Sequence, residues 1–176
     1  ARIMISASMK AEDGMELPLN MSYFAYDPKD LPSNDRMIAD AKDMVKRLTV
    51  LRDAPVVDPY TGPAILSGPA SGVFFHEIFG HRIEGHRLKG GGETFKKKVG
   101  ELVLPADFQV YCDPTLRSYA GEELNGFYLY DDQGVKARRV DVVKDGVLRE
   151  FLMSRVPLDG FPRSSGQIGR ASCRER

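Results

Sequence analysis

The chain has few of the features that mark secreted, membrane-spanning or nucleic-acid-binding proteins. It contains only 2 cysteines among 176 residues, and we expect them to form no structural disulfide, as is typical of the reducing cytoplasm. No apolar run is long enough to cross a bilayer, and the N-terminus shows no signal-peptide pattern. Lysine plus arginine (25) balance aspartate plus glutamate (25), so no net charge attracts nucleic acid or an anionic membrane. We therefore predict a cytoplasmic protein with neither of these partners.

The most informative stretch that is present is His76-Glu77-Ile78-Phe79-Gly80-His81. Neutral imidazole nitrogens are common zinc ligands, and a carboxylate beside them can accept a proton from the water that attacks a substrate. The pattern is typical of zinc hydrolases, and it predicts His76 and His81 as metal ligands and Glu77 as the catalytic residue. In an alternative interpretation the two histidines are unrelated and Glu77 lies on the surface.

The spacing of the two histidines differs from the usual zincin pattern, because three residues instead of two separate Glu77 from His81. At about 100° per residue, histidines four apart lie roughly 40° from each other around a helix, whereas His76 and His81 would lie roughly 140° apart. A straight α-helix would direct the two imidazoles to different places. A π-type bulge would bring them together, and so would a helix that is already unwinding at His81. Gly80 makes either distortion easier.

Two further polar residues follow the motif. Glu84 comes three residues after His81, and its carboxylate can accept a hydrogen bond from the imidazole nitrogen that does not bind metal. A surface pair of Glu84 with Arg87 is the alternative. His86 is again five residues beyond His81, so the three imidazoles would spread around a regular helix. We therefore interpret Glu84 and His86 as supporting residues of the site, although a distorted helix end would allow His86 to be a ligand.

The first third of the chain predicts a β-hairpin followed by an amphipathic helix. Strands are expected at 3–9 and 15–24, on either side of the turn signal Asp13-Gly14. Ser33 or Asn34 can cap the helix. Its apolar residues recur at helical spacing, which indicates a packing helix: Met37, Ala41, Met44, Val45, Leu48 and Leu51.

The remainder predicts a second helix and then short strands. A stretch rich in proline and glycine at 53–69 separates the two regions. The helix with the metal motif is expected at about 70–85, and to be buried, because much of its circumference is apolar. Strands are expected at 108–112, 126–130, 135–143 and 147–153. The predicted fold class is α+β, in which an N-terminal hairpin and packing helix precede a metal-binding helix packed on an antiparallel β-meander.

Residues 72–86, GVFFHEIFGHRIEGH, closely resemble the signature helix of the TldD/PmbA family of zinc metallopeptidases. Segments downstream and upstream are similar to other landmarks of the same family in the same order. They are Ala11-Glu12-Asp13-Gly14-Met15, Val99-Gly100-Glu101-Leu102-Val103, Asp131-Asp132-Gln133-Gly134-Val135, Asp145-Gly146-Val147-Leu148 and Phe161-Pro162-Arg163-Ser164-Ser165-Gly166.

The resemblance implies a zinc-dependent peptidase that cleaves short or unfolded polypeptides inside a dimer, formed with itself or with a related subunit. It also implies a third zinc ligand, a cysteine beyond the point where this sequence stops. Cys112 is interpreted instead as a small apolar side chain of a strand. We expect a fragment that is inactive by itself. Two alternatives stay open, a non-catalytic partner or scaffold subunit and a zinc hydrolase of a non-peptide amide.

Three parts of the chain are predicted. Residues 1–53 are interpreted as the C-terminal part of an N-terminal α/β domain, and residues 54–167 as the start of the β-rich catalytic domain with the His-Glu-x-x-x-His helix. Residues 168–176, which include Cys173, read back in codons as ATCGGAAGAGCGTCGTGTAGGGAAAGA. That string looks like a ligated short-read sequencing adapter, so we expect these residues to be a translated artefact.

Overall fold

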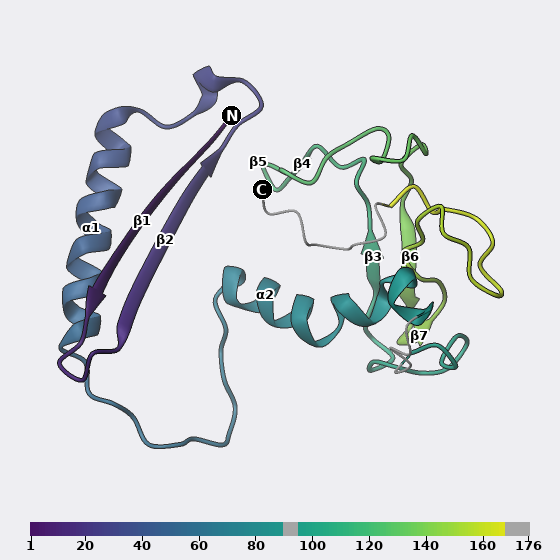
Figure 1. The fold of residues 1–176 in the computed structure, drawn as a ribbon, viewed down its shortest axis with the longest axis horizontal. Coiled ribbons are helices and arrows are strands. Elements are labelled where there is room, and N and C mark those ends of the chain that lie inside the picture. The colour runs from purple at the N-terminus through teal and green to yellow at the C-terminus, as the bar shows by residue number, and fades with distance from the viewer. Residues whose placement is uncertain (90–94, 168–176) are drawn as a thin grey trace. The chain divides into compact units, whose positions relative to one another are not determined.

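The structure, a computed structural model, describes residues 1–89 and 95–167 (Figure 1). Its helices and antiparallel strands confirm the predicted α+β class. The chain divides into two units: unit 1 comprises Ala1–Pro63 with Gly121–Asn125, and unit 2 comprises Ala64–Ala120 with Gly126–Arg176. No helix within the described ranges is long and apolar enough to cross a membrane. The predicted artefact at 168–176 lies outside the described residues.

Unit 1 begins with the predicted β-hairpin. β1 (Arg2–Lys10) pairs antiparallel with β2 (Glu16–Phe24), and half-buried residues alternate with exposed ones along both strands. Asp13 Oδ1 accepts a hydrogen bond from Met15 N at 2.9 Å in the connecting turn. The hairpin is therefore formed where the Asp13-Gly14 signal predicts it. A short 3-10 turn, η1 (Pro28–Asp30), follows.

The helix of unit 1, α1 (Asn34–Arg52), matches the predicted packing helix. Ser33 is its N-cap, and Ser33 Oγ accepts a hydrogen bond from Arg36 N at 3.3 Å. Met44 and Leu48 are buried, and their four-residue spacing places them on one face of the helix. The cap is confirmed, and so is the apolar face at Met44 and Leu48, whereas Val45 and Leu51 of the predicted face are exposed.

Unit 2 begins with the helix that carries the metal motif, α2 (Gly68–Ile78), which starts and ends earlier than predicted. Two 3-10 segments follow it, η2 (Gly80–Ile83) and η3 (Gly85–Lys89). No residue of α2 is buried, and apolar side chains such as Val73 and Phe74 are exposed. The prediction of a buried metal helix is therefore wrong for the described chain. The chain leaves helical geometry before it reaches the core, so the 3-10 segments are buried in place of the helix.

The sheet of unit 2 is smaller than the predicted meander. β3 (Val110–Cys112), β6 (Val140–Lys144) and β7 (Val147–Leu148) form an antiparallel sheet with β6 in the centre. The strands β4 (Ser118–Tyr119) of unit 2 and β5 (Glu122–Glu123) of unit 1 have two residues each. The sheet therefore keeps the predicted antiparallel character over a shorter length.

One of the four predicted strands is wrong. Three of them form in shortened versions as β3, β6 and β7. The strand predicted at 126–130 is not formed, and only its last residue, Tyr130, makes an isolated bridge, to Lys136. The extent of such strands depends on partners that are distant in the sequence, which a local pattern does not identify.

The core of unit 2 joins the segments after α2 to the sheet. Its buried members are Phe79, Ile83, Leu88, Val140, Val142, Val143, Leu148, Phe151, Leu152 and Met153. Phe75 is partly buried and packs against this core from α2, and its ring stacks on that of Phe79 with centroids 5.0 Å apart. The metal-motif region is thus anchored at the C-terminal end of α2.

Candidate metal centre

The two histidines of the motif belong to different local structures. His76 lies in the last turn of α2, whereas His81 lies in η2. Between them, Phe79 has φ −124° and ψ −47°, outside the α-helical range, although its N–H still bonds to Phe75 O at 3.0 Å. The helix therefore ends before His81, which is the second of the two geometries that would bring the histidines together.

Both imidazoles face the carboxylate of Glu77. His76 Nε2 is 3.6 Å from Glu77 Oε1, and His81 Nε2 is 3.6 Å from Glu77 Oε2. The two ring centroids are 4.4 Å apart. One ligand atom from each of the three side chains lies within 4.8 Å of the others, a separation at which all three can reach one ion. The imidazoles are mostly shielded, while the Glu77 side chain is 60% exposed.

Glu84 holds His81 through the other ring nitrogen. The carboxylate is 1% exposed, and its Oε1 lies 2.9 Å from His81 Nδ1. Arg87 Nε donates a hydrogen bond to Glu84 Oε2 at 2.5 Å, so the buried negative charge has a cationic partner. When Nδ1 of a histidine donates to a carboxylate, its Nε2 presents a lone pair to a metal. Glu84 is thus placed where the sequence analysis expects it.

His86 lies beside Glu84 and outside the cluster. His86 Nε2 is 3.7 Å from Glu84 Oε2. Among the described residues, the group able to hold a metal ion consists of His76, Glu77 and His81. His86 therefore lies next to the buried carboxylate, and it is not brought together with the other two imidazoles.

Backbone hydrogen bonds fix the chain on both sides of Glu84. Leu152 N donates to Ile83 O, and Gly85 N donates to Leu152 O, each at 2.9 Å. Leu152 could not be recognised as part of the site from the sequence, because a residue that acts through its peptide group leaves no side-chain signal. Its position depends on a contact between segments that are far apart in the sequence.

Cys112 is not placed to be a ligand. It is half-buried at the end of β3, and burial raises the pKa of its thiol to about 11. A thiolate is the form that binds metal, and this environment disfavours it. The structure agrees with its interpretation as a small apolar side chain.

Asp131 is a second buried carboxylate, 5% exposed. Its Oδ1 accepts hydrogen bonds from Gln133 N and Val135 N, both at 2.9 Å, so it organises a turn. Its Oδ2 is buried and has no hydrogen-bond partner among the described residues. The role of Asp131 is therefore conformational, and it lies outside the His76–Glu77–His81 group.

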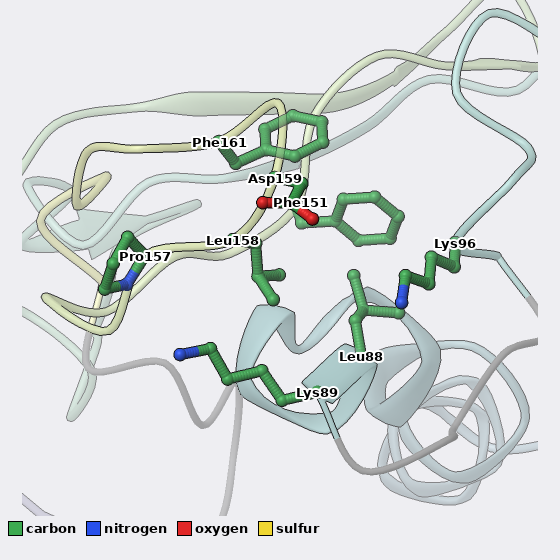
Figure 2. A pocket seen from close by; sticks show the side chains of 8 residues that line it. All are labelled: Leu88, Lys89, Lys96, Phe151, Pro157, Leu158, Asp159 and Phe161. Carbon is green, nitrogen blue, oxygen red and sulfur yellow. The ribbon is translucent and has the colours of Figure 1, made fainter.

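A cavity of about 320 Å³ opens next to η3 (Figure 2). Aromatic and aliphatic side chains form most of its wall, together with two lysines and one aspartate. The lining residues are Leu88, Lys89, Lys96, Phe151, Pro157, Leu158, Asp159 and Phe161. None of the three residues of the metal cluster lines this cavity, so it is a separate feature of unit 2.

The donor set of the cluster fits a transition metal such as zinc. Two imidazole nitrogens with a carboxylate beside them suit zinc, and the buried carboxylate on His81 Nδ1 is the support that metal-binding histidines usually have. Magnesium and calcium prefer sites built from several oxygen ligands, which this group does not provide. The fold and the site together define an α+β protein with a candidate metal centre of two histidines and a glutamate.

The family follows from comparison with known proteins. Residues 59–172 match the family model described as the PmbA/TldA metallopeptidase C-terminal domain, and the chain belongs to this family. The resemblance predicted from the sequence is confirmed.

Curated relatives carry names of the same class. The chain is 36% identical over 91 residues to a metalloprotease of Archaeoglobus fulgidus, a match that covers 52% of this chain and 20% of the relative. It is 35% identical over 91 residues to a metalloprotease of Methanocaldococcus jannaschii, covering 52% of this chain and 19% of the relative. The matches thus span about a fifth of these relatives.

A solved structure shares the fold. A Bacteroides thetaiotaomicron protein, described as a candidate modulator of DNA gyrase, superposes with a TM-score of 0.59 at 12% sequence identity. The match covers 87% of this chain and 33% of that chain. At this identity the likeness concerns the fold alone.

Proposed function

We propose that this chain is part of a zinc-dependent metallopeptidase that hydrolyses peptide bonds in short or unfolded polypeptides. The observation that carries the proposal is the convergence of His76, Glu77 and His81, whose ligand atoms lie within 4.8 Å of one another. Membership of a metallopeptidase family supports a peptide bond as the target. The names of the archaeal relatives point in the same direction.

His76 and His81 are the proposed metal ligands, each through Nε2. Both Nε2 atoms face the same carboxylate at 3.6 Å, so they are directed to one place. Bound zinc would lower the pKa of a coordinated water and polarise the substrate carbonyl. A third protein ligand, which the family resemblance implies to be a cysteine outside the printed sequence, would complete the set.

Glu77 is the proposed general base and acid. Its exposed carboxylate lies beside both Nε2 atoms and in contact with solvent, so it can exchange protons there. Glu77 would accept a proton from the attacking water at a carboxylate oxygen, and then donate a proton to the leaving amine nitrogen. The carboxylate is ionised again after the second transfer, as a catalyst requires.

Glu84 is proposed to fix the tautomer and the orientation of His81. Its hydrogen bond to Nδ1 keeps the proton on that nitrogen and leaves Nε2 to the metal. Arg87 and His86 surround the same carboxylate and stabilise its buried negative charge. These residues touch neither substrate nor metal, so their contribution is to position His81.

The remaining parts of the proposal concern the whole protein. We infer a cytoplasmic peptidase that works as a dimer with itself or with a related subunit, and whose substrates reach an enclosed site. A scaffold subunit with no activity would have no need of a water-activating carboxylate between two histidines. Amide hydrolysis outside peptides would use the same water activation, so it is distinguished by substrate and not by the site.

The test uses the full-length protein. Zinc content is measured by elemental analysis for the parent, His76→Ala and His81→Ala, with Glu101→Gln as the control, because Glu101 pairs with Lys98 on the surface and contacts none of the three cluster residues. We expect the first two variants to lose zinc and Glu101→Gln to keep it. Cleavage of unstructured peptides is then compared with cleavage of small non-peptide amides. Zinc retained in both His76→Ala and His81→Ala, or a parent protein that binds no zinc, would overturn the proposal.

A further inference from the structure

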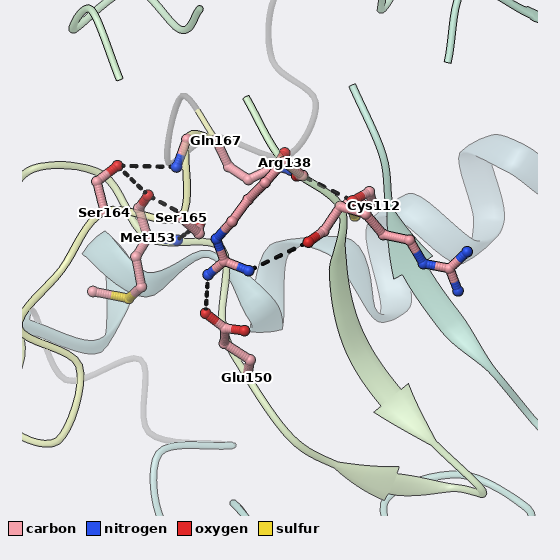
Figure 3. Close-up of polar contacts among 9 residues, drawn as sticks. Cys112, Arg138, Glu150, Met153, Ser164, Ser165 and Gln167 are labelled. Atoms are coloured by element: carbon pink, nitrogen blue, oxygen red, sulfur yellow. Dashed lines mark hydrogen bonds and ion pairs between the residues drawn. The ribbon is translucent and has the colours of Figure 1, made fainter. Parts of the chain in front are cut away.

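Leu152 and Met153 link the segment around Glu84 to a second segment, residues 164–167, which we call the serine clamp. Figure 3 shows Met153 together with Ser164, Ser165 and Gln167 of the clamp. Consecutive residues of an extended chain direct their peptide groups to opposite edges. The peptide groups of Leu152 bond to the residues on either side of Glu84, and those of Met153 bond to the clamp. The two-residue link therefore lies between the metal-motif region and the clamp.

The peptide groups of Met153 bond to both serines of the clamp. Met153 N donates to Ser165 Oγ at 2.8 Å. Met153 O accepts hydrogen bonds from Ser165 N and from Ser164 Oγ, each at 3.1 Å. Ser165 is 1% exposed, so no solvent replaces its hydroxyl if that group is removed. Met153 N–H would then be buried without an acceptor, and the link would have to move to recover one.

The clamp itself is anchored to the chain that leads into β6. Gly166 has φ +70°, and a Cβ at this position would lie 2.1 Å from Lys136 O, so the close approach requires glycine. Gln167 Nε2 donates to Arg138 O at 3.0 Å and lies 3.5 Å from Cys112 O. Residues 164–167 are thus fixed against the sheet, and they can hold the link in place.

A second glycine brings the link against the metal-motif region. A Cβ at Gly85 would lie 2.3 Å from Met153 Sδ and 3.0 Å from Leu152 O. The hydrogen bond from Gly85 N to Leu152 O therefore depends on the missing side chain. Because Gly85 follows Glu84 directly, a displacement of Leu152 also displaces the backbone of Glu84.

We propose that the serine clamp is a positioning device for the metal centre. It holds the link against Gly85 and thereby keeps the Glu84 carboxylate on His81 Nδ1. The inference rests on the proposed function for the identity of the metal, whereas the contact between Glu84 and His81 exists without an ion. Residues that support metal-binding histidines are typically worth about 10–100-fold in metal affinity. Because the clamp acts on Glu84 only through the two-residue link, we expect loss of the Ser165 hydroxyl to weaken zinc binding by about tenfold.

The experiment compares Ser165→Ala with Ser154→Ala in the full-length protein. Ser154 is also buried, and its Oγ accepts a hydrogen bond from Val156 N, but it makes none of the clamp contacts with Met153. The tautomer of His81 is read in the zinc-free protein, labelled with ¹⁵N-histidine, by long-range ¹H–¹⁵N spectra. Zinc affinity is measured by competition with a chelator. Ser164→Ala serves as a milder second variant.

We expect His81 of the parent and of Ser154→Ala to carry its proton on Nδ1. In Ser165→Ala the proton should redistribute between both nitrogens, and zinc should bind about tenfold more weakly. Equal spectra in Ser165→Ala and Ser154→Ala would overturn the inference, whether both match the parent or both differ from it. If Ser165→Ala does not fold, the spectrum of Ser164→Ala decides by the same criterion. A parent that binds no zinc refutes the metal site, while the tautomer measurement still tests the clamp.

Discussion

His81 Nδ1 and Glu84 Oε1 lie 2.9 Å apart, and the carboxylate in this pair is almost completely buried. A buried carboxylate is stabilised only if its oxygens are paired, and here His81 and Arg87 occupy both of them. The pair is local in sequence, but its burial depends on Leu152 from the other side of the core. The orientation of His81 is therefore set by tertiary packing as well as by the helix end.

The first prediction concerns the charge of Glu84. Glu84→Gln removes the charged acceptor of His81 and Arg87, so we expect zinc affinity to fall by about 10–100-fold. Stability should fall by about 1–3 kcal/mol, because buried polar groups lose a partner. Glu101→Gln is the control, since Glu101 pairs with Lys98 at 2.5 Å on the surface. Chelator competition and chemical denaturation measure the two effects, and equal zinc affinity in both variants would contradict the role of Glu84.

The second prediction separates metal binding from proton transfer. Glu77→Gln keeps a polar side chain of the same size beside the imidazoles but removes the base. We expect the full-length variant to bind zinc normally and to lose about 10²–10⁴-fold in kcat. Elemental analysis and peptide cleavage are measured on the same sample. Unchanged turnover with normal zinc content would remove Glu77 from the catalytic role.

The third prediction tests the close approach at Gly166. Gly166→Ala adds a Cβ within 2.1 Å of Lys136 O at a residue with φ +70°. Gly134→Ala is a matched control, because Gly134 has φ +74° and nothing within 4 Å of its added Cβ. We expect the control to lose about 1 kcal/mol from backbone strain alone and Gly166→Ala to lose about 1–3 kcal/mol more. The difference between the two unfolding free energies isolates the steric contact, and a difference near zero would contradict the tight fit.

The fourth prediction concerns the reactivity of Cys112. Burial raises the pKa of its thiol to about 11, so at pH 8 only about one molecule in a thousand carries the thiolate. Cys112 should react slowly with iodoacetamide at pH 8, and faster as the pH rises toward the pKa. Peptide mapping distinguishes it from Cys173. Unfolding in guanidinium should restore an ordinary rate, and rapid labelling of the folded protein would contradict the burial.

The fifth prediction concerns how the stability of unit 1 depends on pH in the acid range. The hydrogen bond from Tyr23 to Asp40, followed by that from Arg36, holds the pKa of the Asp40 carboxyl below its ordinary value. Stability from such a group is present above the unfolded pKa and is lost as the pH falls through the folded pKa. Tyr23→Phe should therefore raise the pKa of Asp40 and weaken this acid dependence. A ¹³C titration of the Asp40 carboxyl measures the shift.

The control for that experiment is Tyr60→Phe. Tyr60 is an exposed tyrosine of the same unit, and its hydroxyl bonds to Pro63 O at 3.3 Å. The Asp40 titration should be unchanged in this variant. A pKa of Asp40 that stays low in Tyr23→Phe would assign the shift to Arg36 instead.

The parts of the fold that the sequence predicts well are those with local causes. The hairpin follows from the Asp13-Gly14 turn and from alternation along the strands, and α1 follows from the Ser33 cap and helical spacing. The strand predicted at 126–130 fails because its alternation has no pairing partner in the described chain beyond the bridge at Tyr130. Pairing between distant segments decides strand length, and no local pattern contains that information.

In the candidate site, too, the features with local causes could be predicted from the sequence and the others could not. The identities of His76, Glu77 and His81 are readable from chemistry and spacing, and so is the hydrogen-bonding partner at Glu84. Their convergence required knowing that the backbone changes at Phe79, because a regular helix would have spread the imidazoles. The serine clamp was not predicted as a support, since serines bonded to peptide groups resemble those of any loop.

Because the backbone conformation changes at Phe79, the two imidazoles lie on two secondary-structure elements that are packed into the core to different extents. His76 belongs to a helix with no fully buried residue, whereas His81 belongs to a 3-10 segment fastened into the core. An ion bound by both histidines would cross-link the helix to the 3-10 segment. Removal of the ion should then increase local unfolding of α2, so its amide hydrogens would exchange faster while those of the sheet keep their rates.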